Sequence, residues 1–260
     1  MTRKFPNPAN RRLLSQLNGS NVLSLNAISL LTAWEQGVSQ HQLQRAVTLL
    51  TLAWPEKSID EWSRVSIGER DRQLFKLRTE LFGSKLEAIA SCPKCGERLE
   101  LAFRTHDLMT EAMAPEPLQL KSGSFEVDYR LPTNADLLAV ADRPGEAHTL
   151  LLERCVEARN DGVAVHASTL PEPVIKLLGQ KMADADPQAE VQIVLDCPAC
   201  SHRWSTVFDI LSYLWGEIED WAQCLLHEVH SLATAYGWSE HDILSMSATR
   251  RRLYLEMVGA

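Results

Sequence analysis

Four cysteines in two matched pairs are the residues whose types and spacing could carry chemistry in this chain. Cys92 and Cys95 belong to the sequence CPKC, and Cys197 and Cys200 belong to CPAC. A Cys-x-x-Cys turn presents two sulfurs to one ion, and zinc prefers four thiolate or imidazole donors arranged as a tetrahedron. We therefore predict a zinc site with these four cysteines as its ligands.

The distance between the pairs along the chain is unusual. The interval in zinc sites of this kind is about 15 to 20 residues, whereas 101 residues separate Cys95 from Cys197. We interpret the motif as one zinc ribbon split by a long insertion, whose two halves meet in space. A metal bound there would tie the insertion to the rest of the fold, so binding energy would become folding energy.

Three other uses of the cysteines compete with a structural zinc. An iron site of the rubredoxin kind would use the same four sulfurs, and the sequence does not separate it from zinc. A catalytic zinc needs an open coordination position, which four thiolates do not leave. A thiol oxidoreductase uses a single Cys-x-x-Cys in a βαβ setting, which this sequence lacks. Structural zinc is the favoured interpretation.

Other polar candidates are weaker. His227 and His230 lie three residues apart and would share a helix face, which is more often surface than a metal site. His202 follows the second cysteine pair and is expected beside the metal site or exposed. Cys155 and Cys224 lie in apolar helical segments and are expected to be buried and unreactive.

Carboxylates and glycines supply no catalytic pattern. Glu217, Glu219 and Asp220 are expected to form a solvated helix face. The sequence holds no Gly-rich phosphate loop, no G-x-S-x-G elbow and no His-Glu-x-x-His motif. We therefore predict no catalytic residues, no organic cofactor and no enzymatic activity.

Composition describes a chain with a packed core. Its 260 residues are 45% hydrophobic and 23% charged, and the formal net charge is −8. Acidic balance argues against a nucleic-acid partner, which needs a local excess of cations, although Arg11, Arg12 and Arg250–Arg252 form short basic clusters. No apolar stretch reaches the roughly 20 residues of a membrane span. The first residues, MTRKFPNPANRR, carry no secretory signal, so we expect a cytoplasmic protein.

Helices are expected to position the first cysteine pair. Apolar residues recur at helical spacing along Gln42–Trp54, and Pro55 ends that helix. Ser58 and Glu61 form a capping-box pattern that opens a short helix. A longer helix is predicted over Ser66–Phe82, with Gly83 as its stop.

Around and between the cysteine pairs, the spacing of apolar residues changes from the helical period to strict alternation. Alternation predicts strands near 99–103, 125–129 and 191–195. Between them, helices are predicted over Asn134–Val140, Glu146–Ala158 and Pro171–Ala183, with a connector over Met113–Gly123 and a turn over Asp184–Gln188.

The clearest helical pattern covers Asp209–Tyr236, which would be about 40 Å long. Gly237 is its expected stop, Ser239 and Asp242 cap a short helix, and a last helix covers Ala248–Met257. The apolar residues of this helix, from Leu211 to Tyr236, form one stripe, most of which is expected in the core. Its far end, with Arg250–Arg252 beside it, is expected to dock a partner, because Trp, Tyr and Arg dominate many interfaces.

Several stretches resemble one known family over most of residues 70–258. The chain is similar to the baseplate-protein family of contractile phage tails and contractile injection systems, which is often labelled as similar to the T4 baseplate hub assembly chaperone. The resemblance is carried by the two CPxC pairs and by LRTELFGSKLEAIASCPKCGERLEL, YRLPTNADL, ADPQAEVQIVLDCPAC, FDILSYLWGEIEDWAQCLLHEVHSLATAYGWSEHDILSM and RRRLYLEMV. Ser201 departs from it, since this position of a ribbon turn often holds glycine.

The resemblance implies a protein that builds or forms part of a baseplate and binds baseplate, hub or tube proteins, with possible incorporation in a phage-tail-like particle. The runner-up function is a zinc-ribbon nucleic-acid-binding or transcription-associated module. We predict an α+β fold, mainly helical, with a small zinc-ribbon-like β element split by an α/β insertion. The predicted parts are residues 1–90 (helices), 91–105 with 190–208 (the ribbon halves), 106–189 (the insertion) and 209–260 (C-terminal helices).

Overall fold

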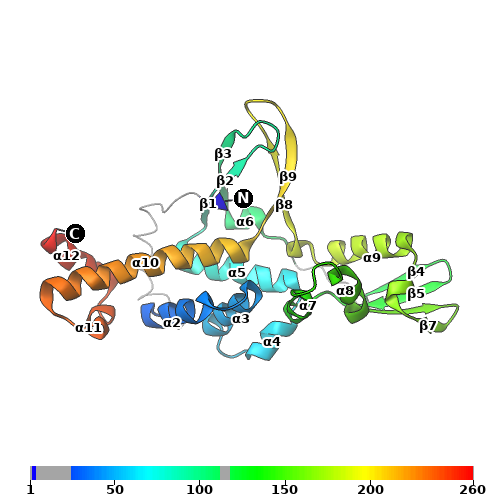
Figure 1. The fold of residues 1–260 in the computed structure, drawn as a ribbon, viewed down its shortest axis with the longest axis horizontal. Coiled ribbons are helices and arrows are strands. Elements are labelled where there is room, and N and C mark those ends of the chain that lie inside the picture. The colour runs from blue at the N-terminus through cyan, green and yellow to red at the C-terminus, as the bar shows by residue number, and fades with distance from the viewer. Residues whose placement is uncertain (1, 4–24, 112–117, 260) are drawn as a thin grey trace.

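A computed structural model describes residues 2–3, 25–111 and 118–259 of the chain. Figure 1 shows an elongated molecule in which a helical body carries a β projection on one side. A small α/β unit lies at one end of the body, and the C-terminal helices lie at the other. In the described part of the chain, no helix combines the length and apolar character that crossing a membrane requires.

The helical body is formed by five helices: α2 (Ala27–Val38), α3 (Gln42–Ala53), α4 (Ile59–Arg64), α5 (Ile67–Phe82) and the start of α10 (Ile210–Tyr236). In it, α2, α3 and α5 pack against the long helix α10, and α4 packs against α3. Ser58 caps one of these helices, as the sequence predicts, Ser66 caps another, and Gly83 ends that second helix at φ 79°. A continuous core that includes Leu50, Leu74 and Phe75 joins the helices.

Two antiparallel hairpins form the β projection, which we call the fin. The first hairpin pairs β2 (Lys85–Ser91) with β3 (Arg98–Arg104), and β1 (Thr2–Arg3) adds to its edge. The second pairs β8 (Val191–Asp196) with β9 (Arg203–Phe208) and forms a separate sheet. Although 86 residues lie between β3 and β8 in the sequence, Figure 1 shows the two hairpins rising from the body together.

The insertion between the hairpins has its own sheet and its own core. Its strands pair antiparallel in the order β4-β5-β6-β7, and apolar residues that include Leu120, Val127 and Leu178 are buried beneath them. The domain boundaries themselves stay a prediction. The insertion contains α6 (Thr105–Leu108), β4 (Gln119–Ser122), β5 (Phe125–Tyr129), α7 (Asn134–Val140), α8 (Ala147–Cys155), β6 (Val156–Asn160), β7 (Val163–Val165), η2 (Ala167–Thr169), α9 (Glu172–Ala185) and η3 (Pro187–Ala189).

Two predictions for the insertion were wrong in part. The helix expected over Glu146–Ala158 ends at Cys155, and the residues that follow form β6, because Val156 and Ala158 are buried in the sheet. The connector expected over Met113–Gly123 contains β4, which pairs with β5. Residues 113–117 of that connector lie outside the described residues, as do Arg11 and Arg12.

The C-terminal helices follow the sequence pattern closely. Asp209 caps α10, and Gly237 ends it in the left-handed conformation at φ 67°. The chain then forms α11 (Glu240–Leu244) and α12 (Ala248–Val258), which fold back against α10. The structure as a whole confirms the α+β fold, with helices dominant and small sheets.

Candidate metal centre

The fin brings the four predicted ligands together. Cys92 and Cys95 lie in the turn between β2 and β3, and Cys197 and Cys200 lie in the turn between β8 and β9. The sulfur atoms of all four lie within 4.8 Å of one another. Two turns that are distant in sequence therefore form one thiol cluster at the tip of the fin.

The two turns have the same backbone structure. In the first, Cys92 N–H donates to Glu97 O at 2.8 Å, and Gly96 N–H donates to Cys92 O at 2.9 Å. In the second, Cys197 N–H donates to the His202 carbonyl and Ser201 N–H to the Cys197 carbonyl, each at 2.9 Å. Gly96 and Ser201 occupy equivalent positions, and both have positive φ, 77° and 54°. The backbone of each turn thus directs both of its sulfurs to the same side.

The spacing of the sulfurs fits a tetrahedral zinc site. Cys92 Sγ lies 3.7 Å from Cys200 Sγ, and Cys95 Sγ lies 3.5 Å from Cys197 Sγ. A Zn–S distance of about 2.3 Å implies an S···S edge of about 3.8 Å in a tetrahedron. The close sulfur pairs come from different hairpins, so a metal held by all four would join the hairpins at their tips.

The acidities of the thiols show how crowded the cluster is. Burial disfavours the Cys92 thiolate, but the backbone N–H groups of Cys95 and Lys94 outweigh it and lower the Cys92 pKa to about 7. The Glu97 N–H group lowers the Cys95 pKa, but the sulfurs around it, Cys200 first, raise that pKa to about 12. The first thiol ionises readily and the last resists ionisation, because the negative charges would lie close together. A divalent cation among the sulfurs would remove that repulsion.

The apolar faces of the hairpins position the tips. Leu86, Ala90, Ile193 and Leu195 are buried in the core that extends from the helical body into the fin. At the base, the Tyr213 hydroxyl of α10 donates to Glu87 O and accepts from Glu87 N–H, at 2.9 and 3.1 Å. The cluster therefore stands on a packed β element that is fixed to the body.

The geometry of the turns bears on the thiol-oxidoreductase alternative. Each Cys-x-x-Cys lies between two antiparallel strands, in the turn of a hairpin. Redox-active pairs owe the low pKa of their attacking thiol to a helix N-terminus or a neighbouring cation. Both pairs here lack a helix N-terminus, since the residues that follow each turn form a strand.

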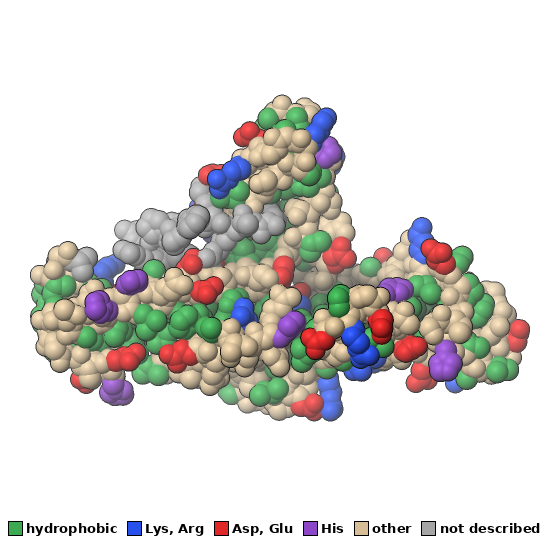
Figure 2. All heavy atoms as spheres, in the orientation of Figure 1, with side chains coloured by type: hydrophobic (Ala, Val, Ile, Leu, Met, Phe, Trp, Pro, Cys, Tyr) green, Lys and Arg blue, Asp and Glu red, His purple; other side chains and the backbone are tan. Residues whose placement is uncertain are grey.

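The charges around the tip are mixed, which bears on the nucleic-acid alternative. Lys94 and Arg98 are exposed beside Glu97, and Arg203 lies 3.9 Å from Asp196 across the second hairpin. Figure 2 shows acidic and basic side chains interspersed along the visible face of the molecule. A phosphate-binding surface needs a concentration of cations, and the fin tip does not supply one within the described residues.

The weaker sequence candidates lie away from the cluster or in other roles. His227 and His230 are exposed on α10, and His202 is half-buried with its ring stacked on Trp204 at 6.1 Å. Cys155 is buried, and that burial raises the pKa of its thiol. Cys224 is half-buried, so the expectation that it is buried was wrong in part.

One expectation was wrong in a way that matters for stability. Glu217 is not part of a solvated face: its side chain is 2% exposed and pairs with Arg78 of α5. Arg78 Nε and Nη2 donate to the two carboxylate oxygens at 2.9 and 2.8 Å. The partners are 139 residues apart in sequence, so no local pattern indicates the pair.

Comparisons with known proteins agree with the resemblance. A family model described as T4 bacteriophage base plate protein matches residues 27–215, more than two thirds of the chain. The matched range includes the helical body, the insertion, both cysteine pairs and the start of α10. Neither the curated proteins nor the solved structures gave a match. The extent of the family match leaves one conclusion: the chain belongs to the T4 bacteriophage base plate protein family.

Proposed function

We propose that this protein is a non-catalytic component or assembly factor of the baseplate of a contractile phage tail or contractile injection system. The observation that carries the proposal is the family match, which spans the body, the insertion and both cysteine pairs. In the proposed role the protein acts by binding baseplate, hub or tube proteins. Its two projections, the fin and the C-terminal helices, offer surfaces that lie outside the helical body.

We further propose that one zinc ion per chain is held by Cys92, Cys95, Cys197 and Cys200. The support is chemical: four sulfurs within 4.8 Å of one another form a complete soft donor set. Four thiolate ligands leave no position for water or substrate. The metal would therefore stabilise the fin and would not act in catalysis.

The metal is tested by elemental analysis of protein purified without chelators. We expect about one zinc per chain, and Cys197→Ser should lose most of it because three thiolates bind more weakly than four. Cys224→Ser is the matched control, since that cysteine lies on α10, outside the cluster. Iron in place of zinc would correct the metal, and protein free of both metals would refute the site.

The baseplate role is tested in a strain that produces the particle. Loss of this chain should abolish sheathed particles, and expression of the chain from a plasmid should restore them. Mass spectrometry of purified particles then separates the two forms of the proposal, since a component remains in the particle and an assembly factor does not. Normal numbers of functional particles without the chain would contradict both forms.

A further inference from the structure

The C-terminal helices form a small unit beyond the main core, held together by one buried arginine. Arg251 of α12 is buried against α10, where its Nε donates to Glu228 at 3.2 Å. Its Nη1 donates to the Met246 carbonyl at 2.7 Å, between α11 and α12. Leu232 of α10 and Ile243 of α11 are fully buried. The inner face of α12 is therefore committed to the fold.

The aromatic residues of this unit are also used internally. Tyr236 and Trp238 stack at 4.4 Å around the Gly237 turn, and Tyr254 packs edge-on against both. Arg250 lies over the Tyr254 ring at 5.8 Å. These rings pack α12 against the end of α10, and Tyr236 stays 36% exposed.

The outer face of α12 presents a different surface. Leu253 is 48% exposed and Met257 is 72% exposed, the highest value among the large hydrophobic residues described as exposed. They are four residues apart and form one ridge on the helix. Arg252 and Glu256, also four apart and 3.6 Å from each other, form a charged ridge beside it.

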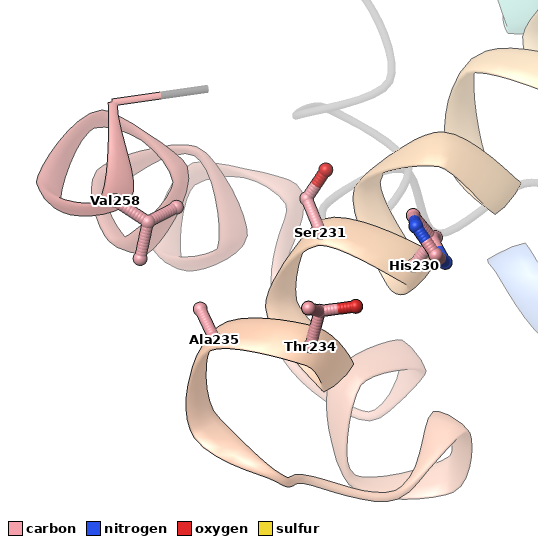
Figure 3. A pocket seen from close by; sticks show the side chains of 5 residues that line it. All are labelled: His230, Ser231, Thr234, Ala235 and Val258. Atoms are coloured by element: carbon pink, nitrogen blue, oxygen red, sulfur yellow. The ribbon is translucent and has the colours of Figure 1, made fainter.

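An open depression of about 280 Å³ lies between α10 and the end of α12. It is lined by His230, Ser231, Thr234 and Ala235 of α10 and by Val258 of α12. Figure 3 shows Val258 of α12 facing Ala235 across this space. Successive helical residues are rotated by about 100°, so Met257 does not share the face on which Val258 lines this space.

From this surface we infer that α12 is a self-association face, on which a second copy of this chain packs its own α12 in the antiparallel direction. A two-fold axis that passes between the two helices, perpendicular to them and level with residues 254–255, places Leu253 of each copy near Met257 of the other. The same axis places Arg252 of each copy opposite Glu256 of the other. Each ridge of one copy is thus complementary to the same ridge of the other copy.

The charge pattern selects the direction of pairing. In the antiparallel arrangement, the charged ridges lie on the same side of the interface and opposite charges meet twice. In a parallel two-fold arrangement, each charged ridge would lie against the apolar ridge of the other copy, which leaves charges buried without partners. The antiparallel pair is therefore the arrangement that this surface favours.

The contact is small, so the dimer should be reversible. An 11-residue helix is about 16 Å long, and a single helix face falls short of the about 800 Å² per partner of a standard interface. We expect a monomer–dimer equilibrium that depends on protein concentration.

Sedimentation equilibrium of the purified full chain tests the inference without any other baseplate protein. We expect the mean mass to rise from the monomer value of 29.2 kDa toward twice that value as concentration increases. Leu253→Asp combined with Met257→Asp should weaken dimerisation about tenfold or more, because it places charge in the apolar ridge. Ile59→Asp is the control: it changes an equally exposed apolar residue on α4 and should leave the equilibrium unchanged.

Charge exchange tests the direction of pairing. Arg252→Glu alone and Glu256→Arg alone should each weaken the dimer about fivefold to tenfold, because like charges then meet at two symmetric contacts. The double variant Arg252→Glu with Glu256→Arg should restore it. A monomer at every soluble concentration would overturn the inference, and a double variant as weak as the single ones would overturn the antiparallel pairing. The outcome is separate from the proposed baseplate role, which is measured by particle assembly.

Discussion

At the scale of single residues, the two cysteine turns differ at one informative position. Gly96 and Ser201 make the same N–H hydrogen bond to a cysteine carbonyl, and both adopt positive φ. Glycine adopts this region at no steric cost, whereas an L-residue with a Cβ loses about 1 kcal/mol there. Serine at 201 thus retains a strain that the equivalent glycine avoids.

Ser201→Gly should therefore stabilise the metal-loaded protein by up to about 1 kcal/mol, since it relieves strain in the folded state. Urea denaturation in the presence of zinc measures the change in the free energy of unfolding. Gly96→Ser is the reciprocal control and should destabilise by a similar amount. A Cβ at residue 96 would meet no other atom, so the cost comes from the positive φ alone. A Ser201→Gly variant less stable than the parent would show that the serine side chain has a role.

A second residue-scale feature is the buried carboxylate of Asp71. Its side chain accepts from Arg70 Nε at 2.7 Å, and Arg70 Nη1 donates to Asn134 of α7. Burial raises the pKa of Asp71 to about 6, against the opposing effect of Arg70, and Asp209 and Asp186 add to the rise. The folded state therefore holds this proton more tightly than the unfolded state does.

The sign of the pH dependence follows from that difference. Between pH 4 and pH 6 the folded protein binds more protons at Asp71 than the unfolded chain, so the free energy of unfolding falls as pH rises. The full effect is about 3 kcal/mol. Asp71→Asn should remove this part of the pH dependence, which denaturation at pH 4.5 and pH 7 measures. The exposed Asp60→Asn is the control, and an unchanged profile in Asp71→Asn would contradict the prediction.

At the scale of elements, the fin is held at both of its ends. The thiol cluster lies at the tip, while buried polar contacts lie at the base, where the insertion begins and ends. Gln188 accepts from Thr110 N–H at 2.6 Å and donates to Leu108 O at 3.2 Å. Asp186 accepts from Gly68 N–H of α5 at 2.8 Å. The insertion thus has ties to the body besides the one that a metal would supply.

Removal of the metal should therefore open the fin from its tip and leave the insertion attached. With a chelator, hydrogen–deuterium exchange should increase strongly in the two cysteine turns and in the adjoining halves of β2, β3, β8 and β9. The segments around Leu108 and Gln188 should stay protected, because their hydrogen bonds are buried at the base. Uniform loss of protection over the insertion would show that the metal is its main tie.

At the scale of the whole molecule, α10 connects the parts. Its first half fills the core of the body, where Trp215 and Trp221 are buried, and Glu217 pairs with Arg78 of α5. Its second half leaves that core and carries α11 and α12. The family match ends at residue 215, so the C-terminal unit lies outside the matched range. The unit therefore lies outside the family match, while Leu244 of α11 packs against the main core and joins the unit to the body.

Truncation after Gly237 should remove α11 and α12 and leave the body folded with its metal. We expect this variant to fail in the assembly of sheathed particles, because the proposed docking surface is lost. Zinc content and thermal unfolding are the controls for folding. Normal assembly with the truncated chain would contradict docking through these helices. Charge reversal at the exposed Arg250 and Arg252 gives the same test if the truncated chain unfolds.

The sequence by itself determined the local structure and singled out the four cysteines that cluster. Periodicity and caps are local properties, so Ser58, Ser66 and Gly237 indicated helix ends that the structure confirms. The four cysteines were recognisable because the two-residue spacing of a metal-binding turn is also local. The family was recognisable from contiguous stretches of sequence, and the family match confirms it.

Only the tertiary structure decided which distant residues meet. It brought Cys92 to within 3.7 Å of Cys200 and buried Glu217 against Arg78. It also ended α8 at Cys155, because the residues that follow form β6, which pairs with β5. Such outcomes depend on burial and on partners far away in the chain. Spacing and propensity along the sequence do not contain that information, since a buried and an exposed glutamate on a helix look alike there.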